Sequence, residues 1–206
     1  MKFLLFSTFT AAIAASSVQT VETIEAGPGQ NCEWLGASYG VDIQCLPGWA
    51  IFGMCGSGWR ADCKPSISSS KYFYMIKCCQ TKYQNYNQQN CHTLGSNSDL
   101  QPCYSDDGKT NQAMYGGCGS GSKQDCKLSD DEKVISSSVC CDNGDLTVGP
   151  DSKCGWKFGS YGDQLECNSD YIVSGYCGSP GSAACGTGAQ MSYTGVYCCP
   201  YVDNKR

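Results

Sequence analysis

The spacing of the cysteines constrains this chain more than any other feature of its sequence. Of 206 residues, 18 are cysteine, and they form three sets of six. In each set seven residues separate the third cysteine from the fourth, and the last two cysteines are adjacent. Such a period indicates three tandem copies of one structural unit, and we expect Cys-rich repeats over residues 32–79, 91–141 and 154–199. The sets are Cys32, Cys45, Cys55, Cys63, Cys78 and Cys79; Cys91, Cys103, Cys118, Cys126, Cys140 and Cys141; and Cys154, Cys167, Cys177, Cys185, Cys198 and Cys199.

We expect all of these cysteines to form disulfides, because each set is even and oxidised cysteine substitutes for a small apolar core in extracellular proteins. Six cysteines allow 15 pairings, and the sequence does not choose among them. Clustered cysteines can also bind zinc instead of forming disulfides, but the Cys-x-x-Cys spacing common in zinc sites does not occur. We therefore expect no metal and no cofactor.

The first residues have the pattern of a secretory signal peptide. Lys2 precedes a short apolar run that ends in Ala12-Ile13-Ala14, so residues 1–15 are expected to be removed and residues 16–31 to form a flexible leader. We expect a secreted, extracellular protein without a membrane span, because no later segment is long and apolar enough. The net charge of −5, without a basic stripe, argues against nucleic acid as a partner.

The residues between the cysteines favour strands. Each adjacent cysteine pair ends a β-prone run, as in the first copy over residues 72–77, and no helical periodicity of useful length is present. Successive side chains of a strand point to opposite faces, so Cys78 and Cys79 are expected to tether one strand to two different neighbours. The prediction is an all-β, disulfide-rich fold. It leaves open whether the copies are separate beads or one interwoven domain.

Some of the repeated positions resemble the vitelline membrane outer layer protein I family. The resemblance lies in Cys45-x-x-Gly48-Trp49-x-x-x-Gly53 followed by Met75-Ile76-Lys77-Cys78, and in Cys167, Tyr171, Gly175 and Tyr197-Cys198 of the third copy. It implies three β-sheet repeats arranged as a prism with pseudo-three-fold symmetry. It also implies an extracellular coat protein with a carbohydrate-binding cleft, and it carries over no catalytic residue.

The aromatic residues are the best candidates for ligand contacts, because exposed rings can stack on sugars or anchor protein partners. Trp34 and Trp156 occupy equivalent positions after the first cysteine of their copies and are expected to pack on disulfides. Trp59 has no counterpart in the other copies. We therefore take Trp59, together with Trp49 and Tyr115, as the candidate contacts.

The sequence assigns no catalytic residue. The single histidine, His92, lies at the start of the second copy, where a surface position explains it better than a nucleophilic triad does. We therefore expect a non-enzymatic extracellular binding, matrix or coat protein with a glycan or protein partner. The alternatives are an inhibitor that inserts its Cys55–Cys63 loop into an enzyme, and a carbohydrate-active enzyme that uses Asp106 or Asp107.

Overall fold

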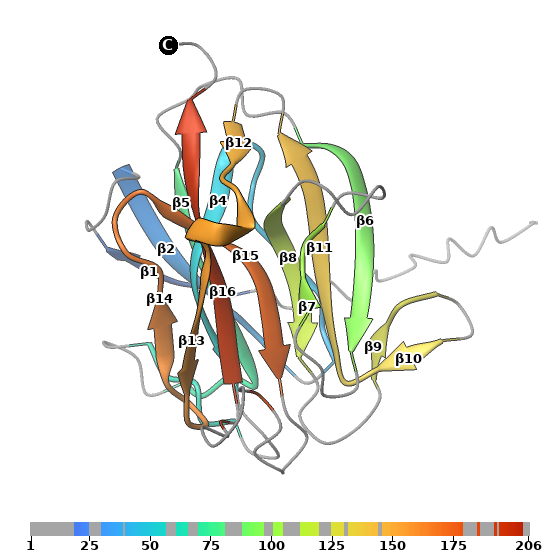
Figure 1. Ribbon diagram of the computed structural model, residues 1–206. Coiled ribbons are helices and arrows are strands. Elements are labelled where there is room, and N and C mark those ends of the chain that lie inside the picture. Colours follow the sequence, from blue (N-terminus) through green and yellow to red (C-terminus); the bar gives the residue numbers. More distant parts are fainter. Residues whose placement is uncertain are drawn as a thin grey trace, which may run out of the picture.

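Each six-cysteine copy supplies most of one antiparallel β-sheet (Figure 1). The computed structural model describes residues 19–24, 30–38, 40–56, 61–65, 70–80, 88–96, 101–104, 112–119, 125–129, 132–143, 146–178, 185, 192 and 194–203. Within these ranges every strand pairing is antiparallel, and one turn of 3-10 helix, η1 (Asp151–Lys153), is the sole helical element. The expected all-β, disulfide-rich class is confirmed.

The strands form three larger sheets and one small hairpin. The first sheet has the order β1 (Gln19–Ile24), β2 (Gln30–Ala37), β5 (Tyr74–Gln80), β4 (Trp49–Gly56) and β14 (Gln164–Glu166). The second has the order β3 (Ile43–Gln44), β8 (Ala113–Gly119), β11 (Ser136–Asn143) and β6 (Gln88–Ser96). The third has the order β12 (Leu146–Val148), β16 (Thr194–Asp203), β15 (Tyr171–Gly178) and β7 (Gln101–Pro102), and β13 (Gly155–Gly159) also pairs with β16. The hairpin joins β9 (Cys126–Lys127) and β10 (Lys133–Val134).

The disulfides have the same nested pattern in every copy. The first cysteine bonds to the sixth, the second to the fifth and the third to the fourth, and no cysteine is free. As predicted, the adjacent cysteines bond to different segments: Cys79 to Cys32 on the neighbouring strand β2, and Cys78 to Cys45 in the connection that follows β3. The nine bridges are Cys32–Cys79, Cys45–Cys78, Cys55–Cys63, Cys91–Cys141, Cys103–Cys140, Cys118–Cys126, Cys154–Cys199, Cys167–Cys198 and Cys177–Cys185.

Although the bridges stay within their copies, the sheets do not. The short strand that precedes the second cysteine of each copy pairs with a strand of another copy. β3 of the first copy adds to β8 of the second, β7 of the second adds to β15 of the third, and β14 of the third adds to β4 of the first. The exchange therefore runs around the three sheets in one direction and closes on itself. The pseudo-three-fold symmetry of the whole molecule stays a prediction.

The same backbone hydrogen bond fixes each exchanged strand. In every case the amide of a copy's second cysteine donates to the carbonyl oxygen of the residue that precedes the repeated glycine of the next copy. The three bonds are Cys45 N to Tyr115 O (2.8 Å), Cys103 N to Ser174 O (2.6 Å) and Cys167 N to Phe52 O (2.9 Å).

The repeated glycine two residues before the third cysteine explains how the exchanged strand can come so close. Gly175 faces Pro102 across the β15–β7 pair, and a Cβ added to Gly175 would lie 2.6 Å from the carbonyl oxygen of Gln101. Gly53 and Gly116 face β14 and β3 in the same way. The glycine is thus required by the contact between copies.

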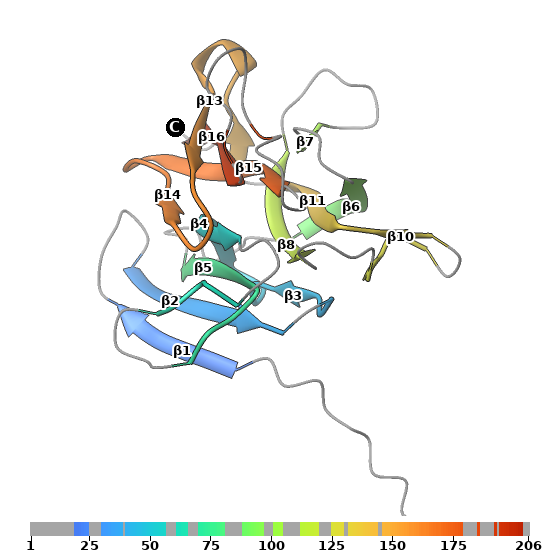
Figure 2. The same ribbon diagram turned by 90° about the horizontal axis from the view of Figure 1, so that it is seen from below.

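The three sheets enclose a common interior. Viewed along the strands, they lie on three sides of it (Figure 2), and the strands that carry the third cysteines, β4, β8 and β15, contact one another. The central core cluster contains Ile51 and Ile76 of the first copy, Met114 of the second, and Val173 and Val196 of the third, each at most 1 % exposed. The copies therefore form one interwoven unit rather than separate beads.

Part of the expected flexible leader, residues 16–31, is regular structure. β1 (Gln19–Ile24) pairs with β2 from Gln19 opposite Gly36 to Ile24 opposite Cys32, and β2 itself begins at Gln30. Polar and β-branched residues such as Thr20 and Thr23 suit an edge strand, so the leader expectation is corrected over these residues. The expected signal peptide, residues 1–15, lies outside the described residues.

Two buried tyrosines in the common interior make the fold sensitive to alkali. The rings of Tyr74 and Tyr176 meet edge to face with centroids 5.5 Å apart. Burial raises the pKa of Tyr176 to about 12, and burial, followed by the nearby Tyr176 and Asp42, raises the pKa of Tyr74 well above its usual value of 10.0. Both phenols therefore stay protonated in the folded protein at a pH where the unfolded chain ionises.

We therefore expect the free energy of unfolding to fall as the pH rises above 10. The stabilising difference is fully present below the unfolded pKa and is lost between pH 10 and the folded value. The slope is about 1.4 kcal/mol per pH unit for each such tyrosine. Denaturant titrations between pH 8 and 11.5 measure it. Tyr176→Phe should make the slope shallower, Tyr171→Phe at a half-buried tyrosine is the control, and equal slopes in all three proteins would contradict the assignment.

Candidate binding site

The structure separates the three ligand contacts that the sequence suggested. Trp59 lies outside the described residues. Trp49, at the start of β4, is half-buried and packs against the central core, so part of its ring is accessible. Tyr115 is only 1 % exposed, because β8 is buried along its whole length, and its assignment as a ligand contact is wrong.

The two equivalent tryptophans differ in exposure. Trp34 is 1 % exposed and is buried with Tyr72, Met75 and the Cys55–Cys63 bridge, which confirms the expected packing on a disulfide. Trp156, like Cys154, packs against the cluster that contains Cys199 but is only half-buried. One aromatic position therefore serves the core in the first copy and lies at the surface in the third.

A residue on the strand that pairs with each tryptophan strand differs between the two copies. Aligned on their adjacent cysteines, β5 and β16 place Met75 of the first copy where the third copy has Gly195. A Cβ on Gly195 would lie 2.8 Å from the Phe158 ring and 3.4 Å from the Trp156 ring. Both rings therefore rest on the bare backbone of β16.

Trp156, Phe158 and Tyr197 form what we call the aromatic shelf. The Trp156 and Phe158 rings are nearly parallel, with an interplanar angle of 8° and centroids 5.9 Å apart. Tyr197, opposite Trp156 in the β13–β16 pair, lies 5.0 Å from it, also centroid to centroid. Trp156 and Phe158 alternate with Lys157 on β13, so the two rings share one face of this strand.

A carboxylate lies at one end of the aromatic shelf. Asp151 of η1 accepts hydrogen bonds at Oδ1 from the hydroxyl of Tyr197 and from that of Tyr104, the latter at 3.3 Å. Burial and the hydrogen bond to Asp151 hold the pKa of Tyr197 well above its usual range, and burial and the Asp151 charge also raise the pKa of Tyr104. Both phenols therefore remain hydrogen-bond donors to Asp151 at neutral pH. Because Tyr104 belongs to the second copy, this end of the shelf is shared between two copies.

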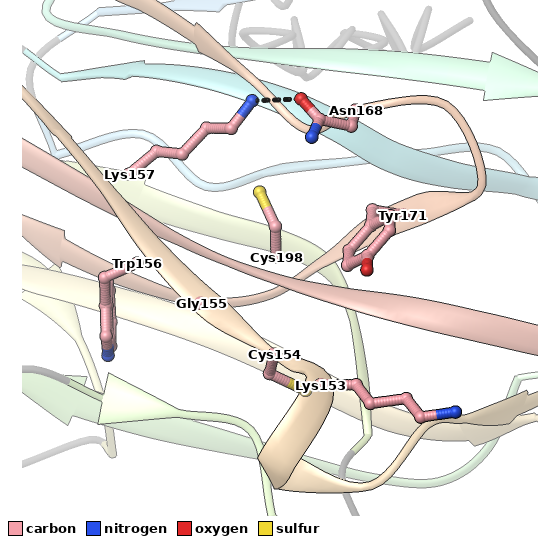
Figure 3. Close-up of a pocket in the computed structure, with 8 residues that line it drawn as sticks. All are labelled: Lys153, Cys154, Gly155, Trp156, Lys157, Asn168, Tyr171 and Cys198. Atoms are coloured by element: carbon pink, nitrogen blue, oxygen red, sulfur yellow. Dashed lines mark hydrogen bonds between the residues drawn. The ribbon is translucent and has the colours of Figure 1, made fainter.

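A small pocket opens beside the shelf, on the other side of β13 (Figure 3). Its volume is about 240 Å³, at the small end for ligand sites. Lys157 Nζ donates hydrogen bonds to Asn168 Oδ1 and to the Glu166 carbonyl oxygen, both at 2.7 Å, whereas the Trp156 ring projects from the opposite side of the strand. The pocket is lined by Lys153, Cys154, Gly155, Trp156, Lys157, Asn168, Tyr171 and Cys198.

The cysteines at the pocket are in disulfides, so they offer no thiolate. Among the residues that the structure describes, no group of three or more His, Cys, Asp or Glu side chains is placed to hold a metal ion. His92 is half-buried on β6, opposite Cys140, and Asp106 and Asp107 lie outside the described residues.

Sequence reasoning missed the aromatic shelf, although two signals for it were present. Phe158 follows Trp156 at the spacing that puts two side chains on the same face of a strand. Gly195 interrupts the β-prone run before Cys198 and Cys199, at the position where the first copy has Met75. A missing side chain on the strand that pairs with two aromatic residues is a local sign that their rings lie against the backbone.

No family model, curated protein or solved structure matches the chain. In the described part of the chain there is also no helix with the length and apolar character needed to cross a membrane.

Proposed function

We propose that this chain is a secreted, non-enzymatic extracellular binding protein of the coat or matrix type, and that it binds a glycan on the aromatic shelf. The observation that carries the proposal is the half-buried pair Trp156 and Phe158, held nearly parallel on the glycine of a disulfide-tethered strand. Flat, accessible aromatic faces stack on sugar rings. The nine bridges and the signal-like residues 1–15 support an extracellular setting.

The rigidity of the shelf supports a binding role. β13 is tethered next to its first residue by the Cys154–Cys199 bridge and along its length by pairing with β16. Rings that are already ordered lose little conformational entropy when a ligand binds. A shallow site such as the aromatic shelf can therefore still bind a ligand with useful affinity.

Replacing Trp156 with alanine should weaken glycan binding about 30-fold, the effect of losing about 2 kcal/mol from an anchoring aromatic residue. A glycan array identifies the ligand, and titration calorimetry with a soluble oligosaccharide measures the change. Trp49→Ala, at a half-buried tryptophan of the first copy, is the matched control and should bind like the unmodified protein. If Trp49→Ala loses binding and Trp156→Ala does not, the site is not the aromatic shelf.

A further inference from the structure

The end of the aromatic shelf presents hydrogen-bond acceptors to a ligand. Tyr104 and Tyr197 both donate their hydroxyl hydrogens to Asp151 Oδ1. The second carboxylate oxygen of Asp151 and the lone pairs of the two phenol oxygens can each accept a hydrogen bond from a ligand. Asp151 is exposed, so a ligand on the shelf can reach it.

This end of the shelf also carries negative charge beside aromatic rings. Trp156 is the aromatic side chain that attracts cations most strongly, and it lies 5.0 Å from the Tyr197 ring whose hydroxyl binds Asp151. The nearby lysines are directed away from the Trp156 ring: Lys157 bonds to Asn168 on the other side of β13, and Lys153 Nζ points away from Trp156 (Figure 3).

From these observations we infer that the preferred ligand is a glycan that carries primary ammonium groups, such as an oligomer of deacetylated amino sugar. An ammonium group has three donors and no acceptor, so it complements the acceptors at the Asp151 end of the shelf. Its charge is attracted by both the Asp151 carboxylate and the Trp156 ring. An N-acetyl group removes that charge, and with it the attraction to Asp151 and Trp156. The inference rests on the proposed function, because it names the ligand class of the same site.

The test compares two oligomers of equal length, fully deacetylated glucosamine and fully acetylated N-acetylglucosamine, by calorimetry at pH 5.5 with the whole chain. We expect the deacetylated oligomer to bind at least about tenfold more tightly. Asp151→Asn keeps an acceptor for both tyrosines but removes the carboxylate charge, and it should reduce this ratio several-fold, mainly by weakening the binding of the deacetylated oligomer, while the attraction of the Trp156 ring remains. Glu132→Gln, which removes an exposed charge beside the β9–β10 hairpin, is the control and should keep the ratio.

The outcomes distinguish this inference from the proposed function. Equal binding of the two oligomers, or a preference that is undiminished in Asp151→Asn, overturns the ammonium assignment and leaves glycan binding in place. If neither oligomer binds and a glycan array also gives no signal that depends on Trp156, the proposed function fails and the inference fails with it.

Discussion

Removing both long bridges of the first copy, Cys32–Cys79 and Cys45–Cys78, should lower the free energy of unfolding by about 7 kcal/mol, enough to unfold a domain of ordinary stability. Removing either bridge alone should cost only about 3 kcal/mol. The reason is that the Cys45–Cys78 bridge lies inside the loop that the Cys32–Cys79 bridge closes. With one bridge in place, the other closes a ring of only about 15 residues, because Cys32 and Cys45 are close in sequence and Cys78 and Cys79 are adjacent. Only the removal of both releases the whole loop.

Denaturant titrations of the Cys→Ala variants under non-reducing conditions measure these effects. The Cys55–Cys63 bridge, with a sequence separation of 8, is the matched control, because its sulfurs are equally buried and its loss should cost about 2.5 kcal/mol whether or not the other bridges are present. A four-cysteine variant that unfolds at the same denaturant concentration as the two-cysteine variants would contradict the nested model.

The number and spacing of the cysteines were sufficient to predict the all-β, disulfide-rich fold class, but they left open whether the bridges stay within each set of six. They also could not choose the nested pairing, because alternative pairings of six cysteines close loops of similar entropy. Alternation along the strand before Cys78 and Cys79 did predict that the two sulfurs serve different segments, and Cys78 belongs to the central core cluster whereas Cys79 belongs to another.

The ring of exchanged strands could not be predicted from the hydrophobic pattern of the sequence, and the reason is physical. The exchanged strands β3 and β7 are two residues long and β14 is three, too short for any hydrophobic period. The residues that face the repeated glycines, Gln44, Pro102 and Glu166, also share no side-chain chemistry. The feature that the copies share is a backbone hydrogen bond and a close backbone contact. In the sequence this contact is visible only as a glycine at positions 53, 116 and 175.

The candidate site was only partly predictable for a related reason. An aromatic-rich surface was expected, but exposure depends on the partner strand. Tyr115 belongs to a strand that is buried along its whole length. Trp156 lies half-buried against the backbone at Gly195, whereas Trp34 is buried among Tyr72, Met75 and the Cys55–Cys63 bridge. Neither environment can be inferred from the strand that carries the aromatic residue.

Replacing Gly175 with alanine should destabilise the protein by about 3 kcal/mol, because the added Cβ meets backbone atoms that cannot rotate away. It would lie 2.6 Å from the Gln101 carbonyl oxygen and 2.7 Å from the Pro102 Cα, so β7 must move off β15. Gly155→Ala is the matched control. A Cβ there has nothing within 4 Å, and the expected change is within about 0.5 kcal/mol.

Hydrogen exchange locates the damage more sharply than stability does. The Cys103 amide, which donates to the Ser174 carbonyl oxygen at 2.6 Å, should lose its protection in Gly175→Ala. The equivalent amides of Cys45 and Cys167 belong to the other two exchanges and should stay protected. If all three amides lose protection together, the ring of exchanges opens as one cooperative unit. If the Cys103 amide stays protected while stability falls, the repeated glycine is not what admits the exchanged strand.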